Sequence, residues 1–185
     1  MEEGRRPSSF DLMRYWIPVS LLFFCLYGVA DGDISLEKLK AAYVYNFLKF
    51  TVWPAESSPN MPLQLCLGNA DETLRRAFAT LNGQSVNGRK ILVRDSPIKA
   101  EAVGCHVYYL RQGGAPVALR SLAAHRPELL TIGDDEEFIA QGGIIGLREV
   151  DGRLQFDINL AMIKQGHYQI SSQLLQLARN SRMTP

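Results

Sequence analysis

The sequence contains few of the residues from which enzymes build metal and nucleophilic sites. It has three cysteines and three histidines among 185 residues, and no two histidines have the H-E-x-x-H spacing of a zinc-binding helix. No serine lies in a G-x-S-x-G turn, and no glycine-rich loop carries the lysine of a phosphate-binding loop. Cys105 and His106 are neighbours on an expected strand, where they point to opposite faces, which argues against a nucleophile–base pair. The sequence therefore predicts a protein that is not an enzyme and binds no metal and no cofactor.

Neither sign of charge is in excess. The formal net charge is +1 at pH 7, and charged residues make up 21% of the chain. Nucleic-acid binding usually requires a clustered basic face, so this balance gives no indication of a nucleic-acid partner. Hydrophobic residues make up 46% of the sequence, which is enough for one domain with a buried core.

The sequence also lacks an apolar run long enough for a membrane span. The uncharged run from Ile17 to Ala30 follows Arg14 and is shorter than the about 20 residues that a membrane-spanning helix needs. Small residues close the run and Asp31 follows it, which is typical of a signal peptide. We therefore expect residues 1–30 to be a signal peptide and the protein to be exported. An uncleaved N-terminal anchor is the alternative.

The first segment after this run is expected to be an amphipathic helix. Apolar residues recur at steps of three and four from Leu36 to Phe50, with Ser35 as a plausible N-cap and Pro54 ending the helix near residue 52. Charged residues, including Lys40, are expected on the other faces. The apolar side should face a core, although its surplus of aromatic residues also suits a dimer face.

Strand-like and helix-like segments then alternate, which predicts a single-domain α/β sandwich with a mainly parallel central sheet flanked by helices. We place this domain at residues 31–180 and a C-terminal tail at residues 181–185. The acidic residues 134–137 are expected at the N-terminus of a helix. The expected strands span residues 63–67, 90–94, 105–110 and 129–133, and the other expected helices span 71–81 and 116–123.

A C-terminal β-hairpin interrupts this alternation. Residues 144–150 and 153–158 flank Asp151-Gly152, a two-residue turn signal, so that Leu147 should lie opposite Phe156. Arg148 and Asp157 would then share the other face.

Two short helices are expected after the hairpin. The first spans residues 159–165 and is closed by Gly166 as a left-handed cap, and the second spans residues 171–180.

Cys66 and Cys105 are the cysteines that remain after export. Two cysteines in an exported chain favour a disulfide over two free thiols. A pair of buried reduced cysteines is the alternative.

The ends of the expected strands form a candidate ligand site. In open parallel sheets, ligands bind beyond the carboxyl ends of the strands. Asn69, Arg111 and Asp134 follow three of these strands, and Arg111 could hold an anion while Asn69 holds a polar head group. Ordinary turn residues are the alternative interpretation.

The segments "LKAAYVYNFLKFTVWP", "LQLCLGN", "CHVYYL" and "LLTIGDDEEFIAQGGIIGLREVDGRLQFDINL" together resemble the YfiR-like proteins. These are small periplasmic regulators found beside membrane-bound diguanylate cyclases or sensor kinases. The resemblance runs in order through nearly all of residues 36–179.

The resemblance implies a non-enzymatic periplasmic repressor. Such proteins bind the periplasmic sensor domain of an inner-membrane diguanylate cyclase and hold it inactive, and their release raises cyclic di-GMP and favours biofilm formation. An α/β sandwich, a homodimer and a disulfide at the positions of Cys66 and Cys105 are also implied. Well-known relatives carry a second disulfide in the hairpin region. This chain has no cysteine after Cys105, so redox sensing through such a bond is not expected here.

The resemblance assigns no partner contacts residue by residue. We expect them around the hairpin and the last helix, at Arg148, Glu149, Arg153, Ile170 and Leu174. Contact with the membrane would then arise only through the partner. The alternative function is a small-molecule sensor that binds its ligand at the strand ends and acts on a membrane histidine kinase. A hydrolase with an unusual site is a third, more remote reading.

Overall fold

A computed structural model describes residues 35–53, 61–96, 104–111, 116–166 and 168–182. The chain divides into two compact units, and every described residue lies in the unit that spans residues 34–185. The expected signal peptide at residues 1–30 lies outside the described residues. In the ranges given above, every helix is too short or too polar to cross a membrane.

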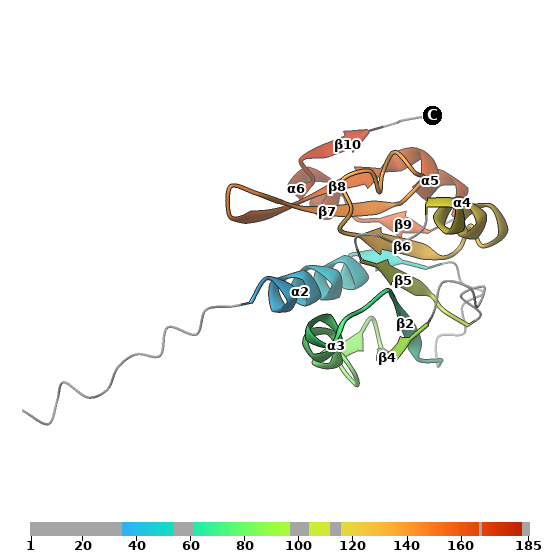
Figure 1. Cartoon of the computed structure of the whole chain (residues 1–185). Helices are drawn as coiled ribbons and strands as arrows, with labels where there is room; N and C mark the ends of the chain where they lie inside the picture. The colour runs from blue at the N-terminus through green and yellow to red at the C-terminus, as the bar shows by residue number, and fades with distance from the viewer. Residues whose placement is uncertain (1–34, 54–60, 97–103, 112–115, 167, 183–185) are drawn as a thin grey trace, which may run out of the picture. The chain divides into compact units, whose positions relative to one another are not determined.

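Helices and strands alternate along the described chain, as expected for an α/β protein (Figure 1). The elements in chain order are α2 (Leu36–Lys49), β1 (Thr51–Val52), β2 (Leu63–Gly68), α3 (Glu72–Ala79), β3 (Ser85–Val86), β4 (Arg89–Asp95), β5 (Val107–Leu110), α4 (Pro116–His125), β6 (Leu130–Gly133), β7 (Ile145–Val150), β8 (Arg153–Asn159), α5 (Leu160–Gln165), β9 (Gln169–Ile170), α6 (Ser172–Leu177) and β10 (Asn180–Arg182).

The main sheet has eight strands in the order β10-β8-β7-β6-β5-β2-β4-β3. The pairs β7–β8 and β3–β4 are antiparallel, whereas the other neighbours are parallel. The α/β class is therefore confirmed, with a sheet of mixed strand direction. A second, two-stranded sheet joins β1 to β9 in antiparallel pairing.

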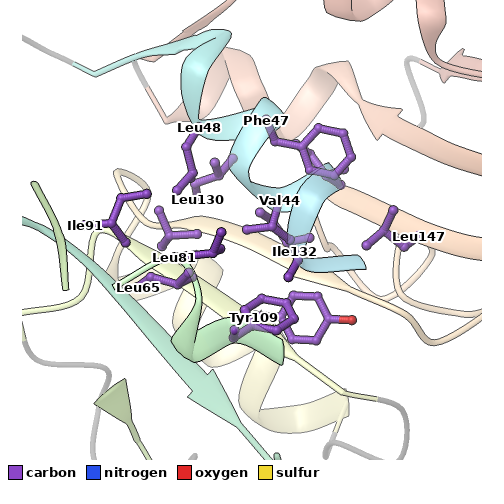
Figure 2. Close-up of a cluster of buried hydrophobic side chains, with 14 of the residues drawn as sticks. Val44, Phe47, Leu48, Leu65, Leu81, Ile91, Tyr109, Leu130, Ile132 and Leu147 are labelled. Carbon is purple, nitrogen blue, oxygen red and sulfur yellow. The ribbon is translucent and has the colours of Figure 1, made fainter. Parts of the chain in front are cut away.

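The central strands bury side chains on both faces, because successive residues of a strand point to opposite sides. On one face, α2 packs on the sheet: Figure 2 shows Val44, Phe47 and Leu48 beside Leu130 and Ile132 of β6. The opposite face holds a second cluster, which includes side chains from β2, β5, α4 and the turn after β6. Its members are Cys66, Cys105, Tyr108, Leu110, Leu119, Leu122, Leu129 and Phe138.

Helix α2 begins where the sequence predicts. The Ser35 hydroxyl accepts a hydrogen bond from the Lys38 N–H at 3.4 Å, which satisfies one of the free amides of the first turn. The helix ends at Lys49 rather than near residue 52. The prediction was wrong at this end because Thr51 and Val52 pair with β9, a partner far away in the sequence.

The hairpin β7–β8 has the predicted register, with Leu147 opposite Phe156. Asp151 and Gly152 have φ angles of 51° and 70°, the left-handed conformation that two-residue turns of this kind require. The sequence Asn87-Gly88 makes a second turn of this type between β3 and β4, with φ angles of 50° and 81°. Sequence analysis did not identify this second hairpin.

The residues after β6 differ from the expectation. Residues 136–142 form turns rather than a regular helix. The Asp135 carboxylate accepts a hydrogen bond from the Glu137 N–H at 2.9 Å and so caps the first of these turns.

The C-terminal elements also required correction. Gly166 has φ −81°, so the prediction of a left-handed cap was wrong. A glycine is needed there for space, because a Cβ would lie 2.5 Å from the Pro127 carbonyl oxygen. The last helix ends at Leu177 instead of continuing to residue 180. The chain then forms β10, which pairs with β8.

Candidate functional site

A pocket of about 230 Å³ lies where β5 and β6 end, which is the edge of the sheet at which a ligand site was expected. Helix α2 and the hairpin β7–β8 form its other walls. The pocket is lined by Leu36, Lys40, Arg111, Asp134, Glu136, Leu147, Arg148, Glu149 and Leu154. We call it the charged pocket.

A buried ion pair forms one wall of the charged pocket. The Lys40 ammonium lies 2.6 Å from Asp134 Oδ2, and the two side chains are 11% and 6% exposed. The Tyr109 hydroxyl donates a hydrogen bond to the same oxygen at 3.1 Å. Burial, followed by the charge of Asp134, raises the pKa of Tyr109, so this hydroxyl stays protonated. Lys40, which was expected outside the apolar stripe of α2, is nevertheless buried, and Asp134 offsets the cost of burying its charge.

Arg111 forms ion pairs with carboxylates of its own chain. It pairs with Asp71, the N-cap residue of α3, and its Nη2 atom lies 3.8 Å from Glu37 Oε1. A hydrogen bond from the Leu74 N–H and a second from Arg111 lower the pKa of Asp71. The carboxylates of Asp71 and Glu37 thus occupy the place beside Arg111 where an anionic ligand was expected.

Arg148 joins the hairpin to the C-terminal segment. It forms an ion pair with Asp157 of β8, and Arg179 Nη2 lies 3.3 Å from the same carboxylate. Burial alone would raise the pKa of Asp157, but hydrogen bonds from Arg148 and Arg179 outweigh it and lower the pKa. Asp157 therefore stays ionised and holds the two arginines together.

The charged pocket brings together residues that the sequence assigned to two different sites. Arg111 and Asp134 were expected to bind a ligand, whereas Arg148 and Glu149 were expected to contact a partner. All four line this pocket. Asn69 is not one of the lining residues, and it is exposed after β2 with φ 54°.

The three other expected contact residues lie elsewhere. Arg153 is exposed at the start of β8, next to the hairpin turn. Ile170 is half-buried in β9 and packs against the main core. Leu174 of α6 is 2% exposed and forms part of a second cavity.

This second cavity is an apolar groove of about 720 Å³ between α2, β8 and α6. We call it the apolar groove. Leu177 stands on its wall with 71% of its surface exposed, and the Gln155 Oε1 atom is buried without a hydrogen-bond partner among the described residues. The groove is lined by Tyr43, Asn46, Phe47, Phe50, Leu154, Gln155, Phe156, Leu174, Leu177 and Arg179.

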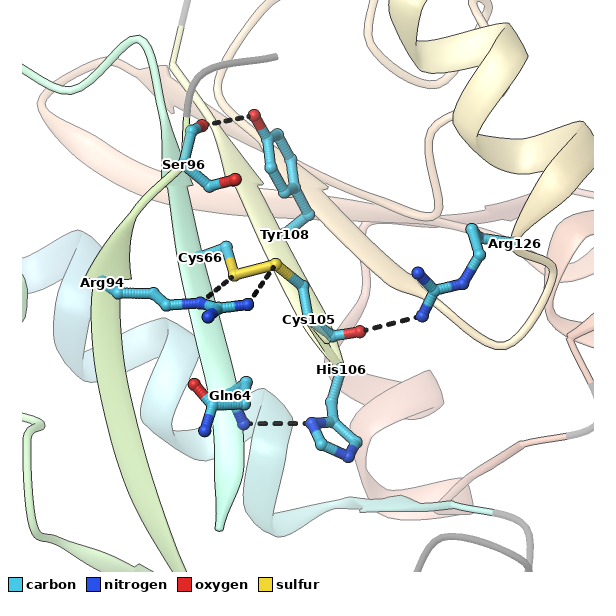
Figure 3. Close-up of a disulfide and its surroundings, with 8 residues drawn as sticks. All are labelled: Gln64, Cys66, Arg94, Ser96, Cys105, His106, Tyr108 and Arg126. Carbon is cyan, nitrogen blue, oxygen red and sulfur yellow. Dashed lines mark hydrogen bonds between the residues drawn. A yellow bond between two sulfur atoms is a disulfide. The ribbon is translucent and has the colours of Figure 1, made fainter. Parts of the chain in front are cut away.

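Cys66 and Cys105 form a disulfide between β2 and the residues before β5, as expected, with Cα atoms 5.9 Å apart (Figure 3). Both cysteines are buried. The Arg94 side chain lies along the bond, with Nε 3.4 Å from Cys66 Sγ and Nη2 3.8 Å from Cys105 Sγ.

His106 lies beside the disulfide and is surrounded by arginines. Its Nδ1 atom accepts a hydrogen bond from the Gln64 N–H at 3.1 Å, and Nε2 lies 3.0 Å from Arg89 Nη2. Burial, together with the charges of Arg89, Arg126 and Arg94, lowers the pKa of His106 from 6.5 to about 4. The ring is therefore neutral at physiological pH. Across the described ranges, no group of Asp, Glu, His or Cys side chains is arranged to hold a metal ion.

Sequence reasoning missed the buried part of the charged pocket and the whole apolar groove. Lys40 and Asp134 are 94 residues apart, and no local pattern links residues at that distance. The aromatic residues of α2 were assigned to the core, and their unusual number was the only sign that some of them line a groove.

The comparison with known families identifies the family of this chain. A family model described as YfiR/HmsC-like matches residues 37–179, which is most of the chain. A search of curated proteins finds no match to the chain.

Proposed function

Because the chain belongs to the YfiR/HmsC-like family, we propose that it is a periplasmic repressor of an inner-membrane diguanylate cyclase. The family resemblance seen in the sequence is confirmed, and membership fits a regulatory protein rather than an enzyme. In this proposal the protein binds the periplasmic sensor domain of the cyclase, holds the enzyme inactive, and so lowers cyclic di-GMP and biofilm formation. The protein reaches the membrane only through this partner.

The apolar groove is the observation that best supports a protein-binding role. Exposed apolar patches rimmed by polar residues mark interaction sites, and aromatic residues are enriched where binding energy concentrates. Leu177 is 71% exposed and gains most from being covered. We propose that an apolar segment of the sensor domain occupies this groove.

Among the residues expected to contact the partner, Leu174 is the one that lines the groove. Leu174 forms part of the groove wall and is too buried to be more than a support. Arg148, Glu149 and Arg153 lie on the hairpin β7–β8, whose second strand also lines the groove, and we propose them as a polar rim. Ile170 remains a proposed contact at the edge strand β9. A homodimer, which the family resemblance implies, is also part of this proposal.

The free energy that repression requires can be compared with the free energy gained when the residues of the groove are covered. A repressor that moves the cyclase from 1% to 99% inactive must prefer the inactive state by about 5.5 kcal/mol. Full burial of one leucine contributes about 1.5–3 kcal/mol. Contacts with Leu177 and with partly exposed aromatic residues such as Tyr43 and Phe50 supply this preference only where the inactive state of the sensor domain makes them and the active state does not.

A binding experiment tests the proposal. The full chain is titrated against the periplasmic domain of the cyclase, and Leu177→Asp is compared with Met61→Asp, which changes a residue that is 56% exposed and outside the groove. We expect Leu177→Asp to weaken binding at least about 30-fold, which corresponds to the loss of about 2 kcal/mol, and Met61→Asp to leave it unchanged. Equal affinities for the two variants would exclude the groove as the docking site. If the unaltered protein does not bind, the cyclase is excluded as the partner. The periplasmic domain of a membrane histidine kinase, the alternative partner, is tested in parallel.

A further inference from the structure

We propose that Arg89 and His106 bind a phosphate group at the edge of the main sheet where β2, β4 and β5 begin. This ligand site goes beyond the proposed repression, and it does not depend on the identity of the partner. Two independent features of this edge favour an anionic ligand: a buried positive charge that has no carboxylate beside it, and two hydrogen-bond donors that face each other.

The side chain of Arg89 crosses the start of β2. Arg89 opens β4, His106 directly precedes β5, and β2 pairs with both of these strands. The Arg89 Nε atom donates a hydrogen bond to the Met61 carbonyl oxygen at 2.8 Å, and Nη2 donates one to the Pro62 carbonyl oxygen at 3.3 Å. These two bonds hold the guanidinium beside the His106 ring, where Nη2 lies 3.0 Å from Nε2.

Arg89 is a buried charge without a counter-ion among the described residues. The residue is 8% exposed, and its polar contacts are two backbone carbonyl groups and the neutral ring of His106. Burial lowers the pKa of Arg89, and no carboxylate of the described chain counteracts this effect. Because buried charges in proteins are normally paired, an anionic ligand would supply the partner that Arg89 lacks.

Both ring nitrogens of His106 face hydrogen-bond donors. Nδ1 lies 3.1 Å from the Gln64 amide nitrogen, as Figure 3 shows, and Nε2 lies 3.0 Å from Arg89 Nη2. A neutral imidazole accepts at only one nitrogen and carries a hydrogen on the other, whereas arginine can only donate. Since Nδ1 accepts from Gln64, the hydrogen on Nε2 faces the hydrogens of Arg89. An anion that accepts from both groups removes this conflict.

The charges around the ring are predominantly positive. Arg126 Nη2 lies 3.3 Å from the Cys105 carbonyl oxygen (Figure 3), and Arg126 forms an ion pair with Glu128. The charges of Arg89, Arg126 and Arg94 all lower the pKa of His106, and no carboxylate of the described residues counteracts them. The potential at the ring therefore favours an anion over a cation.

A phosphate group fits these donors better than a carboxylate does. Arg89 Nη1 forms no hydrogen bond with the described residues, and it is not one of the fully buried atoms without a partner, so a ligand can reach it. Nη1 and Nη2 form the planar fork that binds two oxygens of one phosphate, and the Nε2 hydrogen of His106 can meet a third. A phosphate monoester carries about −1.5 to −2 charges at pH 7 and three acceptor oxygens, whereas a carboxylate offers one charge and two oxygens.

The test uses inorganic phosphate and glycerol 3-phosphate as probes and the full chain as the protein. Binding is measured by isothermal titration at constant ionic strength, with acetate as the carboxylate analogue. Arg89→Gln removes the charge and keeps a donor for a backbone carbonyl group. The matched control is Lys90→Gln, which removes the same charge from an exposed neighbour on the other face of β4. His106→Asn keeps an acceptor for the Gln64 N–H but lacks the Nε2 donor, and it decides the test if Arg89→Gln does not fold.

We expect saturable binding of at least one phosphate probe, at least about 10-fold tighter than acetate. Arg89→Gln and His106→Asn should each weaken it at least about 10-fold, the loss expected for a hydrogen bond to a charged group, and Lys90→Gln should leave it unchanged. The tighter of the two probes identifies the ligand as free phosphate or as a phosphate ester. The proposal is overturned if neither probe binds, if acetate binds equally well, if both site variants retain full affinity, or if Lys90→Gln loses as much as they do. Because repression is not measured, these outcomes leave the proposed function to its own test.

Discussion

The half-buried His106 makes the stability of the protein depend on pH in a defined window. Its pKa is lowered from 6.5 to about 4 in the folded chain, so the unfolded chain takes up the proton first. The contribution of the neutral His106 ring to the free energy of unfolding is therefore fully present above pH 6.5 and decreases as the pH falls towards 4. Below pH 4, this contribution does not change further. We expect His106→Asn, which keeps an oxygen acceptor for the Gln64 N–H, to remove this dependence.

The magnitude follows from the size of the pKa change. One pKa unit corresponds to about 1.4 kcal/mol, so the lowering from 6.5 to about 4 corresponds to roughly 3 kcal/mol in total. About 2 kcal/mol of this is lost between pH 8 and pH 5. Carboxylates with lowered pKa values, such as Asp157, act at lower pH, because their contribution is lost only below the unfolded value of 3.8.

Urea unfolding at pH 8, 7, 6 and 5 measures this effect for the unaltered protein, for His106→Asn and for His125→Asn. His125 is exposed on α4 and serves as the control, so this variant should retain the slope of the unaltered protein. His106→Asn should lose most of the decrease between pH 7 and pH 5. A flat profile in the unaltered protein, or an unchanged slope in His106→Asn, would refute the assignment of the slope to this half-buried ring.

Three further changes are expected to reduce stability, and urea unfolding measures each of them. Replacing Cys66 and Cys105 by alanine removes a bond across 39 residues and should lower the free energy of unfolding by about 3–4 kcal/mol; a loss that dithiothreitol does not reproduce in the unaltered protein would contradict this. Lys40→Met leaves the Asp134 carboxylate buried without its cation and should cost about 3–5 kcal/mol, part of which Lys40→Met/Asp134→Asn should restore. Gly166→Ala places a Cβ 2.5 Å from a backbone carbonyl oxygen and should cost about 1–3 kcal/mol, and wild-type stability would show that the chain yields there easily.

The parts of the fold that depend on local signals were predictable from the sequence. The dipeptide Asp151-Gly152 defines a two-residue turn, and the turn alone sets Leu147 opposite Phe156, as the structure confirms. The same signal at Asn87-Gly88 was overlooked, although it carries the same information. Ser35 was recognisable as an N-cap because capping involves only the next three residues.

The parts that depend on distant contacts were not predictable. Strand β1 exists because Thr51 meets Ile170, and β10 exists because the chain after α6 reaches β8. Lys40 lies outside the apolar stripe of its helix, and only the folded chain shows that its ammonium lies beside Asp134. The candidate site was predicted in its strand-end residues Arg111 and Asp134, but its buried wall required the three-dimensional arrangement.

Repression of a diguanylate cyclase is the central claim, and the cyclic di-GMP content of cells that lack this protein tests it most directly. Nucleotide extracts of the deletion strain are compared with those of the same strain carrying the unaltered chain or Leu177→Asp at equal abundance. The account predicts that cyclic di-GMP rises on deletion, returns to its original level with the unaltered chain, and stays high with Leu177→Asp. An unchanged cyclic di-GMP content in the deletion strain would contradict it.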